Sequence, residues 1–425
     1  MSAVDVLGGG GGSGSGDGGG GGTAVLTAPC PHAGGRLSPS GPEAAEVFFA
    51  APDSTLSHAE GWDVVFGGRF GRGVLNLDGE PHRTYRQALM PLLRSAAVAA
   101  HRGTIEEVVG RAVSSLPVGS PFDLHAVTQT TAFAVAARLF AGLDEREAEE
   151  LYGLYGELRT PPDGELGTPG GNRAARRVGR ARRRVRELLR GAVVRLRDGD
   201  PADGPVRRLR ALPGPPSDDV VAENIAILIL AGYETTGYLS ARLLWLLARH
   251  PEAQEAVRRE VGGPPAEPFA DGPFPAGSFL DGPFLDAVFQ ETARLHPPLA
   301  WLPRRALTDL VCGETRVPAG SEVFYAVGEA QRDPGTFAAP DAFRPERFTE
   351  GERHGRYALT PFGSGRRICA GLHLGTLETK LLAAAVVREF RLTVPPGPYV
   401  GDVSLNGSTV TPARPLLVRL DRIPR

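Results

Sequence analysis

Cysteine is scarce in this chain, and none of it is arranged in pairs. The 425 residues include Cys30, Cys312 and Cys369, an odd number at wide spacings and without a CxxC motif. This pattern argues against a disulfide framework and against a structural zinc site. Cys30 and His32 are two isolated possible ligands, which is weak support for a metal site. We therefore expect a protein of a reducing compartment.

Long apolar segments and a strong net charge are also missing. Neither end of the chain holds a run of about 18 apolar residues, and the first residues lack the basic and apolar regions of a signal peptide. The formal net charge of -2 supplies no global positive field, which disfavours nucleic acid and anionic membranes as partners. These absences predict a cytoplasmic protein that binds neither nucleic acid nor membrane and leave small molecules as ligands.

Glycine is abundant at the start of the chain. Residues 8–22 hold twelve glycines, two serines and one aspartate, and such a stretch has no apolar surface whose burial offsets the entropy lost on ordering. A phosphate-binding glycine loop needs a preceding strand, a lysine and a following helix, none of which is present. We expect a disordered tail over 1–22 and a single domain over 23–425.

Helical periodicity dominates the rest of the chain. Apolar residues recur at spacings of about three and four, and the β-branched runs "SEVFYAV" and "PLLVRL" predict strands between the helices. The expected helices cover residues 42–51, 81–98, 102–115, 126–140, 144–158, 173–196, 217–250, 285–296 and 372–390. The predicted fold class is mainly α with a minor β region.

One of these helices is rich in arginine, which raises the question of nucleic-acid binding. Residues 173–190 carry nine arginines. The same segment carries an apolar stripe at helical spacing, formed by Val178, Ala181, Val185, Leu188 and Leu189. The stripe predicts a surface helix that packs on one side and exposes its arginines on the other.

The segment 361–375, "PFGSGRRICAGLHLG", places Cys369 between a glycine-rich turn and the start of a helix. Free N–H groups at a helix start favour a thiolate, the form that binds metal. Gly363, Gly365 and Gly371 lack the Cβ that would keep the backbone away from a flat ligand, and Arg367 is placed to pair with an acidic group on it. A single cysteine is as commonly a small buried hydrophobe, so the segment alone leaves both interpretations open.

Phe362, Gly365, Arg367, Cys369 and Gly371 match the pattern FxxGxRxCxG. With this signature the chain resembles the cytochrome P-450 family of haem-thiolate monooxygenases. Further segments resemble the family in order and spacing from about Pro42 to the C-terminus, namely "DGEPHRTYR", "AGYETT", "QETARLHPP" and "PERF". The resemblance implies a single triangular-prism fold with haem b between the long central helix and the helix after Cys369, whose sulfur binds the iron.

Two charged residues in "QETARLHPP" lie on one face of a helix. Glu291 and Arg294 are three apart among apolar neighbours, although an isolated pair of this kind is usually a surface pair of little worth. The resemblance adds Arg347 of "PERF" and implies that the three form a structural charge cluster.

The helix expected over 217–250 is interrupted by Gly232, beside Glu234 and Thr235. Glycine weakens a helix, and threonine hydroxyls compete for backbone carbonyls, so we expect a local kink or opening. The resemblance places this opening on the distal side of the iron and implies that Glu234 and Thr235 deliver protons to bound dioxygen.

Basic residues at three places are expected at the cofactor. Pro81 is expected at the first helical position, and His82 and Arg86, four apart, share one face of that helix. The resemblance implies that they bind a haem propionate together with Arg304 and Arg367, and Arg305 is the alternative to Arg304. His82 as axial ligand is disfavoured because no HxxxH pair accompanies it.

The resemblance also implies where substrate binds. Contacts are expected from loop 60–74, from the central helix, from the residues after "QETARLHPP" and from the C-terminal loop, at Phe66, Tyr233, Leu299, Trp301 and Ser408. Cys312 is expected in a family β-hairpin with a structural role. One departure is that "TAVLTAPCPHAGGRLSPSG" stands where the family has a further helix and the first strands, so the wall of the access channel is expected to be thinned or rebuilt.

The implied activity is insertion of one oxygen atom from O2 into a small organic substrate, in specialised metabolism. No flavin or nicotinamide fingerprint is present, so electrons are expected from a ferredoxin and its NAD(P)H-dependent reductase, docking near Arg366 on a monomer. Two alternatives stay open: a haem-thiolate enzyme that uses peroxide or rearranges its substrate, and a haem sensor. The Glu234–Thr235 pair favours the first activity, and a sensor is expected to carry an output domain.

Overall fold

The computed structural model describes residues 36–37, 41–66, 68–159, 169–199, 204–262, 280, 282–351, 354–395, 403–406 and 409–423. Five of the sequence predictions concern residues that lie wholly or mostly outside these ranges. They are the glycine-rich tail over 1–22, Cys30, His32, Ser408 and the rebuilt segment over 23–41, of which residues 36–37 and 41 are described.

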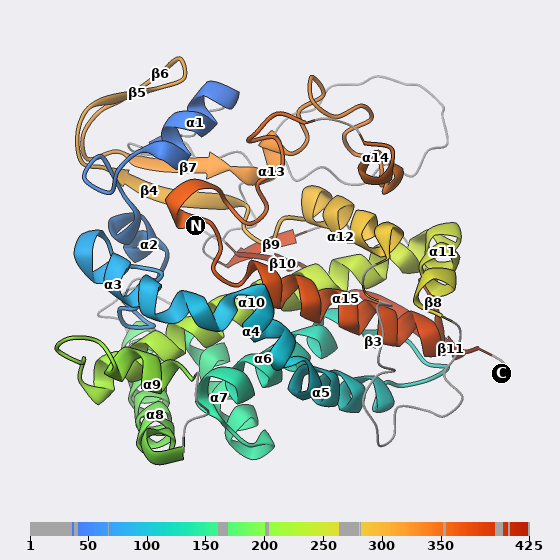
Figure 1. The fold of residues 1–425 in the computed structure, drawn as a ribbon, viewed down its shortest axis with the longest axis horizontal. Coiled ribbons are helices and arrows are strands. Elements are labelled where there is room, and N and C mark those ends of the chain that lie inside the picture. Colours follow the sequence, from blue (N-terminus) through green and yellow to red (C-terminus); the bar gives the residue numbers. More distant parts are fainter. Residues whose placement is uncertain are drawn as a thin grey trace.

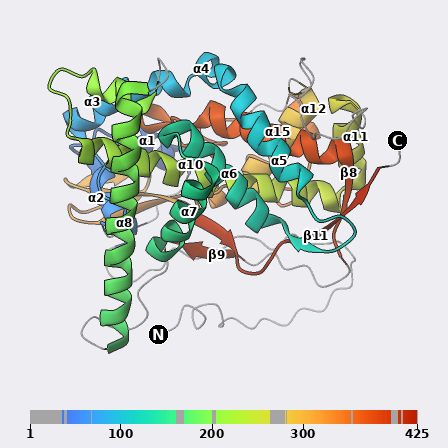
Figure 2. The ribbon, with the colours of Figure 1, turned by 90° about the horizontal axis from the view of Figure 1, so that it is seen from below.

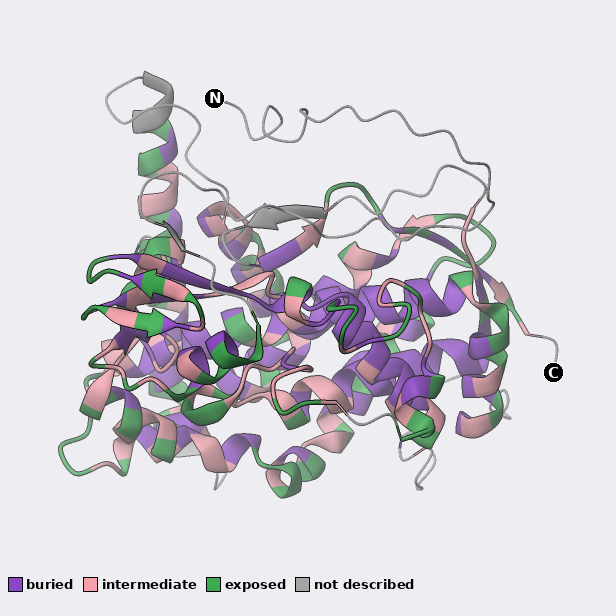
Figure 3. Cartoon of the chain, turned by 90° about the horizontal axis from the view of Figure 1, so that it is seen from above, coloured by how far each residue is buried: buried purple, intermediate pink, exposed green. Residues whose placement is uncertain are grey.

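The long helix α10 (Asp218–Arg249) runs through the middle of the molecule (Figure 1). Ser217 caps it by accepting a hydrogen bond from the N–H of Val220, and the first-turn carboxylates of Asp218 and Asp219 compensate the helix dipole. Figure 3 shows that this centre is almost entirely buried. Helices α6 (Leu124–Ala141), α8 (Pro169–Gly199) and α15 (Leu372–Glu389) pack against it.

The other helices cover this core. Those before α10 are α1 (Pro42–Ala50), α2 (His58–Phe66), α3 (Gly79–Leu89), α4 (Ser95–Ala100), α5 (Arg102–Ser114), α7 (Glu145–Arg159) and α9 (Pro205–Arg210). Those after it are α11 (Pro251–Val261), α12 (Pro283–Leu295), α13 (Val327–Ala330) and α14 (Glu346–Thr349). Two short 3-10 helices are η1 (Met90–Leu93) and η2 (Gly365–Arg367).

The strands form small sheets at the edges of the helical body. The largest has the order β1-β7-β4-β2, with β1 (Arg36–Leu37) parallel to β7 (Glu322–Ala326) and with β4 (Trp301–Ala306) and β2 (Leu56–Ser57) antiparallel. A second sheet joins β3 (Phe122–Asp123), β11 (Leu417–Arg422) and β8 (Phe390–Thr393). The pairs β5–β6 (Leu310–Cys312, Thr315–Val317) and β9–β10 (Val403–Asn406, Thr409–Pro412) complete the described strands. The mainly α fold with a minor β region is thus confirmed.

Helix α8 is a surface helix, as predicted. It extends beyond the body of the molecule (Figure 2). Its own residues Ala181, Val185 and Leu189 are buried on the face that packs against the protein. Several of its arginines are neutralised by neighbouring helices: Arg184 binds Glu150 and Arg195 binds Glu147, both on α7. These arginines are thus partly neutralised on the surface, where such exposed ion pairs contribute little to stability.

The helix predicted over 81–98 is broken into α3, η1 and α4. Pro91 lies at this break and explains it. Proline lacks an N–H donor and restricts the backbone of the residue before it. Helix α3 also starts at Gly79, so Pro81 is its third residue rather than its first. The opening expected at Gly232 is not present as a break, since α10 is continuous through that position.

Among the described residues, no single helix is long and apolar enough to cross a bilayer, although the bent pair α6 and α7 passes the same test when taken together.

Lys380 on α15 is the single lysine of the chain. It is buried, with 7% of its surface exposed, and its Nζ lies 2.6 Å from Oδ1 of Asp286 on α12. This ion pair joins α15, the helix that follows Cys369, to α12, the helix that contains Glu291.

Candidate active site

A cavity of about 240 Å³ lies between α10 and the segment that carries Cys369. Its walls come from elements that are far apart in the sequence, including α2, α3, β4, α6 and α15. Of the residues predicted for the site, eleven line it: Phe66, His82, Arg86, Glu234, Thr235, Leu299, Arg304, Phe362, Arg367, Cys369 and Gly371.

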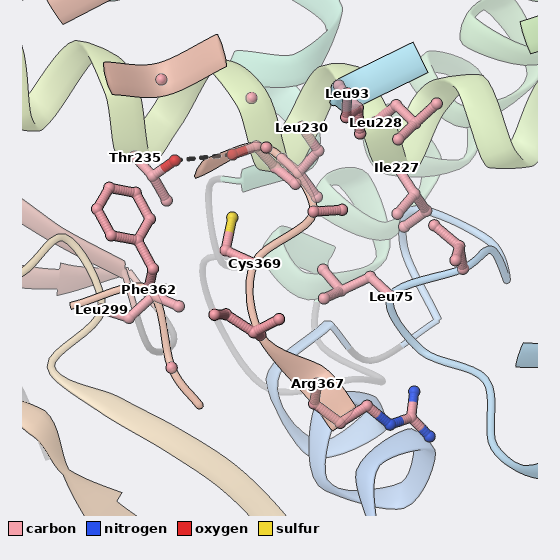
Figure 4. A pocket seen from close by; sticks show the side chains of 18 of the residues that line it. Leu75, Leu93, Ile227, Leu228, Leu230, Thr235, Leu299, Phe362, Arg367 and Cys369 are labelled. Carbon is pink, nitrogen blue, oxygen red and sulfur yellow. Dashed lines mark hydrogen bonds between the residues drawn. The ribbon is translucent and has the colours of Figure 1, made fainter. Parts of the chain in front are cut away.

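Cys369 presents its sulfur to this cavity. The residue follows η2 and precedes α15, its side chain is exposed, and Figure 4 shows the sulfur among the cavity-lining side chains. Its backbone N–H donates to the carbonyl of Phe362 at 2.8 Å, which holds the turn. Burial of this region raises the pKa of the Cys369 thiol, opposed by the Gly371 N–H and the charge of Arg86. The N–H group at the helix start therefore lowers the pKa of Cys369 as expected, but burial raises that pKa by more.

Glycine is required at position 365 for a different reason from the one predicted. Its φ is +66°, and a Cβ there would lie 2.5 Å from the carbonyl oxygen of Phe49 on α1. Gly365 does not line the cavity. The glycine is needed because η2 packs against α1, and not because a flat ligand approaches its backbone.

Three predicted cofactor residues, His82, Arg86 and Arg304, bring donors to the cavity. Arg304 is buried and donates to the Pro303 carbonyl, and it forms no ion pair with a carboxylate of the described part of the chain. Burial lowers the pKa of Arg304 to about 9. Arg86 donates to the Ile368 carbonyl. Burial and the neighbouring arginines lower the pKa of His82 to about 4, so its imidazole is neutral.

Arg305, the alternative to Arg304, faces away from the cavity. Its guanidinium pairs with Glu322 at 3.7 Å. Successive side chains of a strand point to opposite faces, so β4 can direct only one of these two arginines inward.

Arg367 lines the cavity but is already paired with protein carboxylates. Its Nη2 lies 2.8 Å from Asp53 and 2.7 Å from Asp78, and Nη1 donates to Leu77. Asp78 also accepts from Ser57, next to the start of α2. Arg367 thus joins the cysteine segment to the elements that precede α3.

Glu234 and Thr235 lie on the cavity side of α10. The Glu234 carboxylate is buried and accepts hydrogen bonds from Nη1 of Arg159 at 3.2 Å and from the Tyr233 hydroxyl at 3.3 Å. Burial raises the pKa of Glu234, while Arg159 opposes the rise. The Thr235 hydroxyl donates to the Ala231 carbonyl at 2.8 Å, as drawn in Figure 4.

Two residues predicted to contact substrate do not line the cavity. Tyr233 is fully buried on another face of α10, where its ring packs against Phe133. Trp301 lies on the face of β4 opposite to Leu302, which does line the cavity. In both cases the helical or strand period turns the side chain away.

The structure brings Glu291, Arg294 and Arg347 together with no exposed surface. Glu291 accepts two hydrogen bonds from Arg294, at 2.7 and 2.8 Å, and Arg347 lies 3.2 Å away. Arg294 also donates to the carbonyls of Gln331 and Pro340. One carboxylate thus faces two guanidinium groups, and backbone carbonyls accept the hydrogen bonds of their remaining N–H groups. Cys312 is likewise buried in the predicted hairpin, and its thiol contacts the Ala44 carbonyl.

Sequence reasoning missed Arg159, His58 and Asp78. Arg159 is 75 residues from its partner Glu234, so no local pattern connects them. His58 lines the cavity from α2, a segment expected to be a loop, and accepts a hydrogen bond from Trp62. Asp78 could have been identified, because aspartate before a helix start is a common N-cap.

A family model for cytochrome P450 matches residues 209–419. Among curated proteins, the chain is 32% identical over 347 residues to cyclooctat-9-en-7-ol 5-monooxygenase of Streptomyces melanosporofaciens, covering 75% of this chain and 72% of that protein.

Solved structures show the same fold. Retinoic-acid-bound cyanobacterial CYP120A1 matches with a TM-score of 0.78 and 24% identity, covering 91% of this chain and 89% of that one. CYP175A1 of Thermus thermophilus matches with a TM-score of 0.68 and 25% identity, covering 89% of this chain and 87% of that one. With the cysteine signature at the cavity and this relationship over most of its length, the chain belongs to the cytochrome P-450 family of haem-dependent monooxygenases.

Proposed function

We propose that this monooxygenase inserts one atom of O2 into a C–H bond of a small organic substrate in specialised metabolism. The observation that carries the proposal is the exposed Cys369 side chain in a cavity whose α10 wall holds Glu234 and Thr235. A thiolate ligand on haem favours O–O cleavage, and an acid next to an alcohol supplies protons.

The residues around the cavity fit haem. A cysteine sulfur is presented to the cavity, and Gly371 leaves the space beside it open, since a Cβ there would lie 3.9 Å from Sγ. Arg304 is a buried cation without a carboxylate partner among the described residues, and Arg86 and His82 add further donors. A buried cation requires an anion, and haem carries two carboxylates.

In this proposal Cys369 would bind the haem iron through its sulfur, and His82, Arg86 and Arg304 would hold the haem carboxylates. Arg367 acts through Asp53 and Asp78 by fixing the cysteine segment on the elements before α3. Phe362 and Gly371 keep the backbone on either side of Cys369 in place. When bound, haem with a thiolate ligand supplies the activation of dioxygen.

Glu234 and Thr235 have separate tasks. Glu234 holds a proton or releases it at the Arg159 side of α10, where Arg159 is 24% exposed and accessible to water. The Thr235 hydroxyl, now bonded to the Ala231 carbonyl, faces the cavity and passes the proton on. The apolar walls around them exclude other water.

Bacterial members of the family typically draw electrons from redox partners. We infer that here the partner is a ferredoxin with its NAD(P)H-dependent reductase, docking at the exposed Arg366 on the cysteine side of a cytoplasmic monomer. An acidic ferredoxin surface complements this guanidinium.

The test is the absorption spectrum of the dithionite-reduced protein saturated with carbon monoxide. We expect a Soret band at the long-wavelength position of thiolate ligation, lost in Cys369→Ser and retained in the control Cys312→Ser. An unchanged band in Cys369→Ser would refute the assignment of the ligand. Product analysis with a surrogate ferredoxin system then tests oxygen insertion, because peroxide-driven turnover alone would favour the peroxygenase alternative.

A further inference from the structure

One wall of the cavity carries no charged side chain. It is formed by Leu75, Leu93, Phe140, Ile227, Leu228 and Leu230, and we call these residues the apolar wall. Figure 4 shows Leu93, Ile227 and Leu228 near one another and far from Arg367, with Leu75 between them and Arg367. Under the proposed function haem occupies part of this cavity, and a substrate bound beside it on the α10 side would contact Ile227, Leu228 and Leu230 of this wall.

The cations of the cavity lie on other elements and are already engaged. Arg367 is neutralised by two carboxylates. Arg86 and Arg304 hold the haem carboxylates under the proposed function, on which this inference rests. Burial keeps the imidazoles of His58 and His82 neutral by lowering their pKa values. Among the described lining residues, no cation is left for an anionic substrate.

Among the polar groups that line the cavity, Glu234 and Thr409 form a corner that carries no unpaired charge. Thr409 of β10 reaches the cavity because its backbone pairs with Leu299, and its side chain hydrogen-bonds to Glu234. The charge of Glu234 is balanced by Arg159. The corner therefore offers hydrogen-bond acceptors without a net charge, which suits a hydroxyl group better than an ion.

The cost of desolvation determines whether a hydroxyl or a charged group of the substrate is favoured at this corner. A carboxylate or ammonium buried against the apolar wall loses its hydration and finds no counter-ion, whereas a hydroxyl needs only one or two hydrogen bonds to compensate for the water it leaves. A matched alcohol and acid with the same hydrocarbon skeleton should therefore bind with different affinities.

We propose that the cavity selects a neutral, largely hydrocarbon substrate whose polar group is a hydroxyl held at the Glu234–Thr409 corner, and that it rejects the corresponding carboxylate. Leu228 and Thr409 are the specificity-determining residues. Leu228 keeps the wall uncharged, and Thr409 supplies the hydrogen bond.

The experiment uses the haem-loaded protein and two matched pairs of probes: farnesol with farnesoic acid, and perillyl alcohol with perillic acid. Binding is measured by the change of the Soret band and by the shift of the melting temperature. We expect at least one alcohol to bind about tenfold or more tightly than its acid near pH 8.

Two substitutions test the determinants. Leu228→Arg places a cation in the apolar wall and should reverse the preference toward the acid, while the uncharged control Leu228→Met should keep the preference of the parent. Thr409→Val should weaken binding of the alcohol by about tenfold and leave binding of farnesene, a related hydrocarbon without a hydroxyl, unchanged.

Equal affinity for alcohol and acid, or no binding of either alcohol at its solubility limit, would overturn the proposal. The melting shift does not depend on thiolate ligation. A protein that lacks the carbon-monoxide band of a thiolate but still prefers the alcohol would therefore refute the proposed function and retain this inference. A protein that shows the band but does not prefer the alcohol would refute this inference and retain the proposed function.

Discussion

The guanidinium of Arg159, at the end of α7, donates to the carboxylate of Glu234 in the middle of α10, with 3.2 Å between Nη1 and Oε1. Glu234 is buried, and the exposed fraction of Arg159 is 24%. This pair therefore connects an acid at the cavity with the solvent-accessible side of the molecule.

The pair makes stability depend on pH in a defined direction. Burial already raises the pKa of Glu234 in the folded state, and Arg159→Met removes the main opposing cation. A carboxyl whose folded pKa lies above its unfolded value loses stability as the pH rises from the unfolded pKa through the folded pKa. We expect Arg159→Met to cost about 2–3 kcal/mol near pH 8 and clearly less near pH 5, measured by urea unfolding.

Two controls accompany this measurement. Arg159→Lys keeps the cation and should retain most of the stability at both pH values. The double variant Arg159→Met/Glu234→Gln lacks the titrating carboxyl and should lose the extra pH dependence. A loss of equal size at both pH values in Arg159→Met would contradict the role of the ion pair.

Thr235→Ala should uncouple electron use from product formation. The substitution removes the hydroxyl that faces the cavity and now bonds to Ala231, so we expect the share of reducing equivalents recovered as hydrogen peroxide to rise by about tenfold. Thr235→Ser keeps the hydroxyl and serves as control. The ratio of NADH consumed to product and to peroxide is the measurement, and tight coupling in the alanine variant would count against the assigned role.

Glu291→Gln should destabilise the fold strongly. It leaves Arg294 and Arg347 buried without their carboxylate, at a cost of about 3–5 kcal/mol in the free energy of unfolding. The exposed pair Glu80–Arg83 has the same i,i+3 spacing on α3, so Glu80→Gln is a matched control and should leave stability unchanged. Equal effects of the two substitutions, measured by urea unfolding, would show that burial is not the cause.

Gly365→Ala should destabilise the cysteine segment by more than the strain of a positive φ alone. Both Gly365 and Gly68 have a positive φ, but a Cβ at Gly68 meets no atom within 4 Å, whereas one at Gly365 would lie 2.5 Å from the Phe49 carbonyl. We expect Gly68→Ala to cost about 1 kcal/mol and Gly365→Ala to cost more and to reduce haem content. Similar haem content and stability in both variants would argue against close packing of η2 on α1.

Local patterns in the sequence predicted the site best where the partners are close in the chain. Glu291 and Arg294 are one turn apart, and Cys369 lies between a glycine turn and a helix, so spacing indicated their local geometry. The resemblance to the family, and not spacing, favoured a buried charge cluster and a haem ligand. The pairing of Arg159 with Glu234 depends on how α7 packs against α10, which no short pattern encodes. The same holds for Arg367, whose carboxylate partners precede it by almost the whole domain.

Errors in the fold predictions had local physical causes. The helix over 81–98 was overextended because apolar periodicity continues across Pro91, although the proline interrupts the hydrogen bonding. Trp301 was expected at the substrate because of its position after α12, but the alternation of β4 directs Leu302 inward instead. The opening predicted at Gly232 was wrong in so far as it meant a break, because α10 is continuous and mostly buried there, and the alternative of a kink stays a prediction.

The burial of Lys380 has a consequence for studying the redox partner. Since this lysine is the only one and is bound to Asp286 inside the protein, every other side-chain cation above neutral pH is an arginine guanidinium. Carbodiimide cross-linking joins carboxylates to amines, and it finds no exposed lysine here. A failure to cross-link the carboxylates of an acidic ferredoxin would thus carry no information on docking, and reagents that modify guanidinium groups are the suitable probes of that surface.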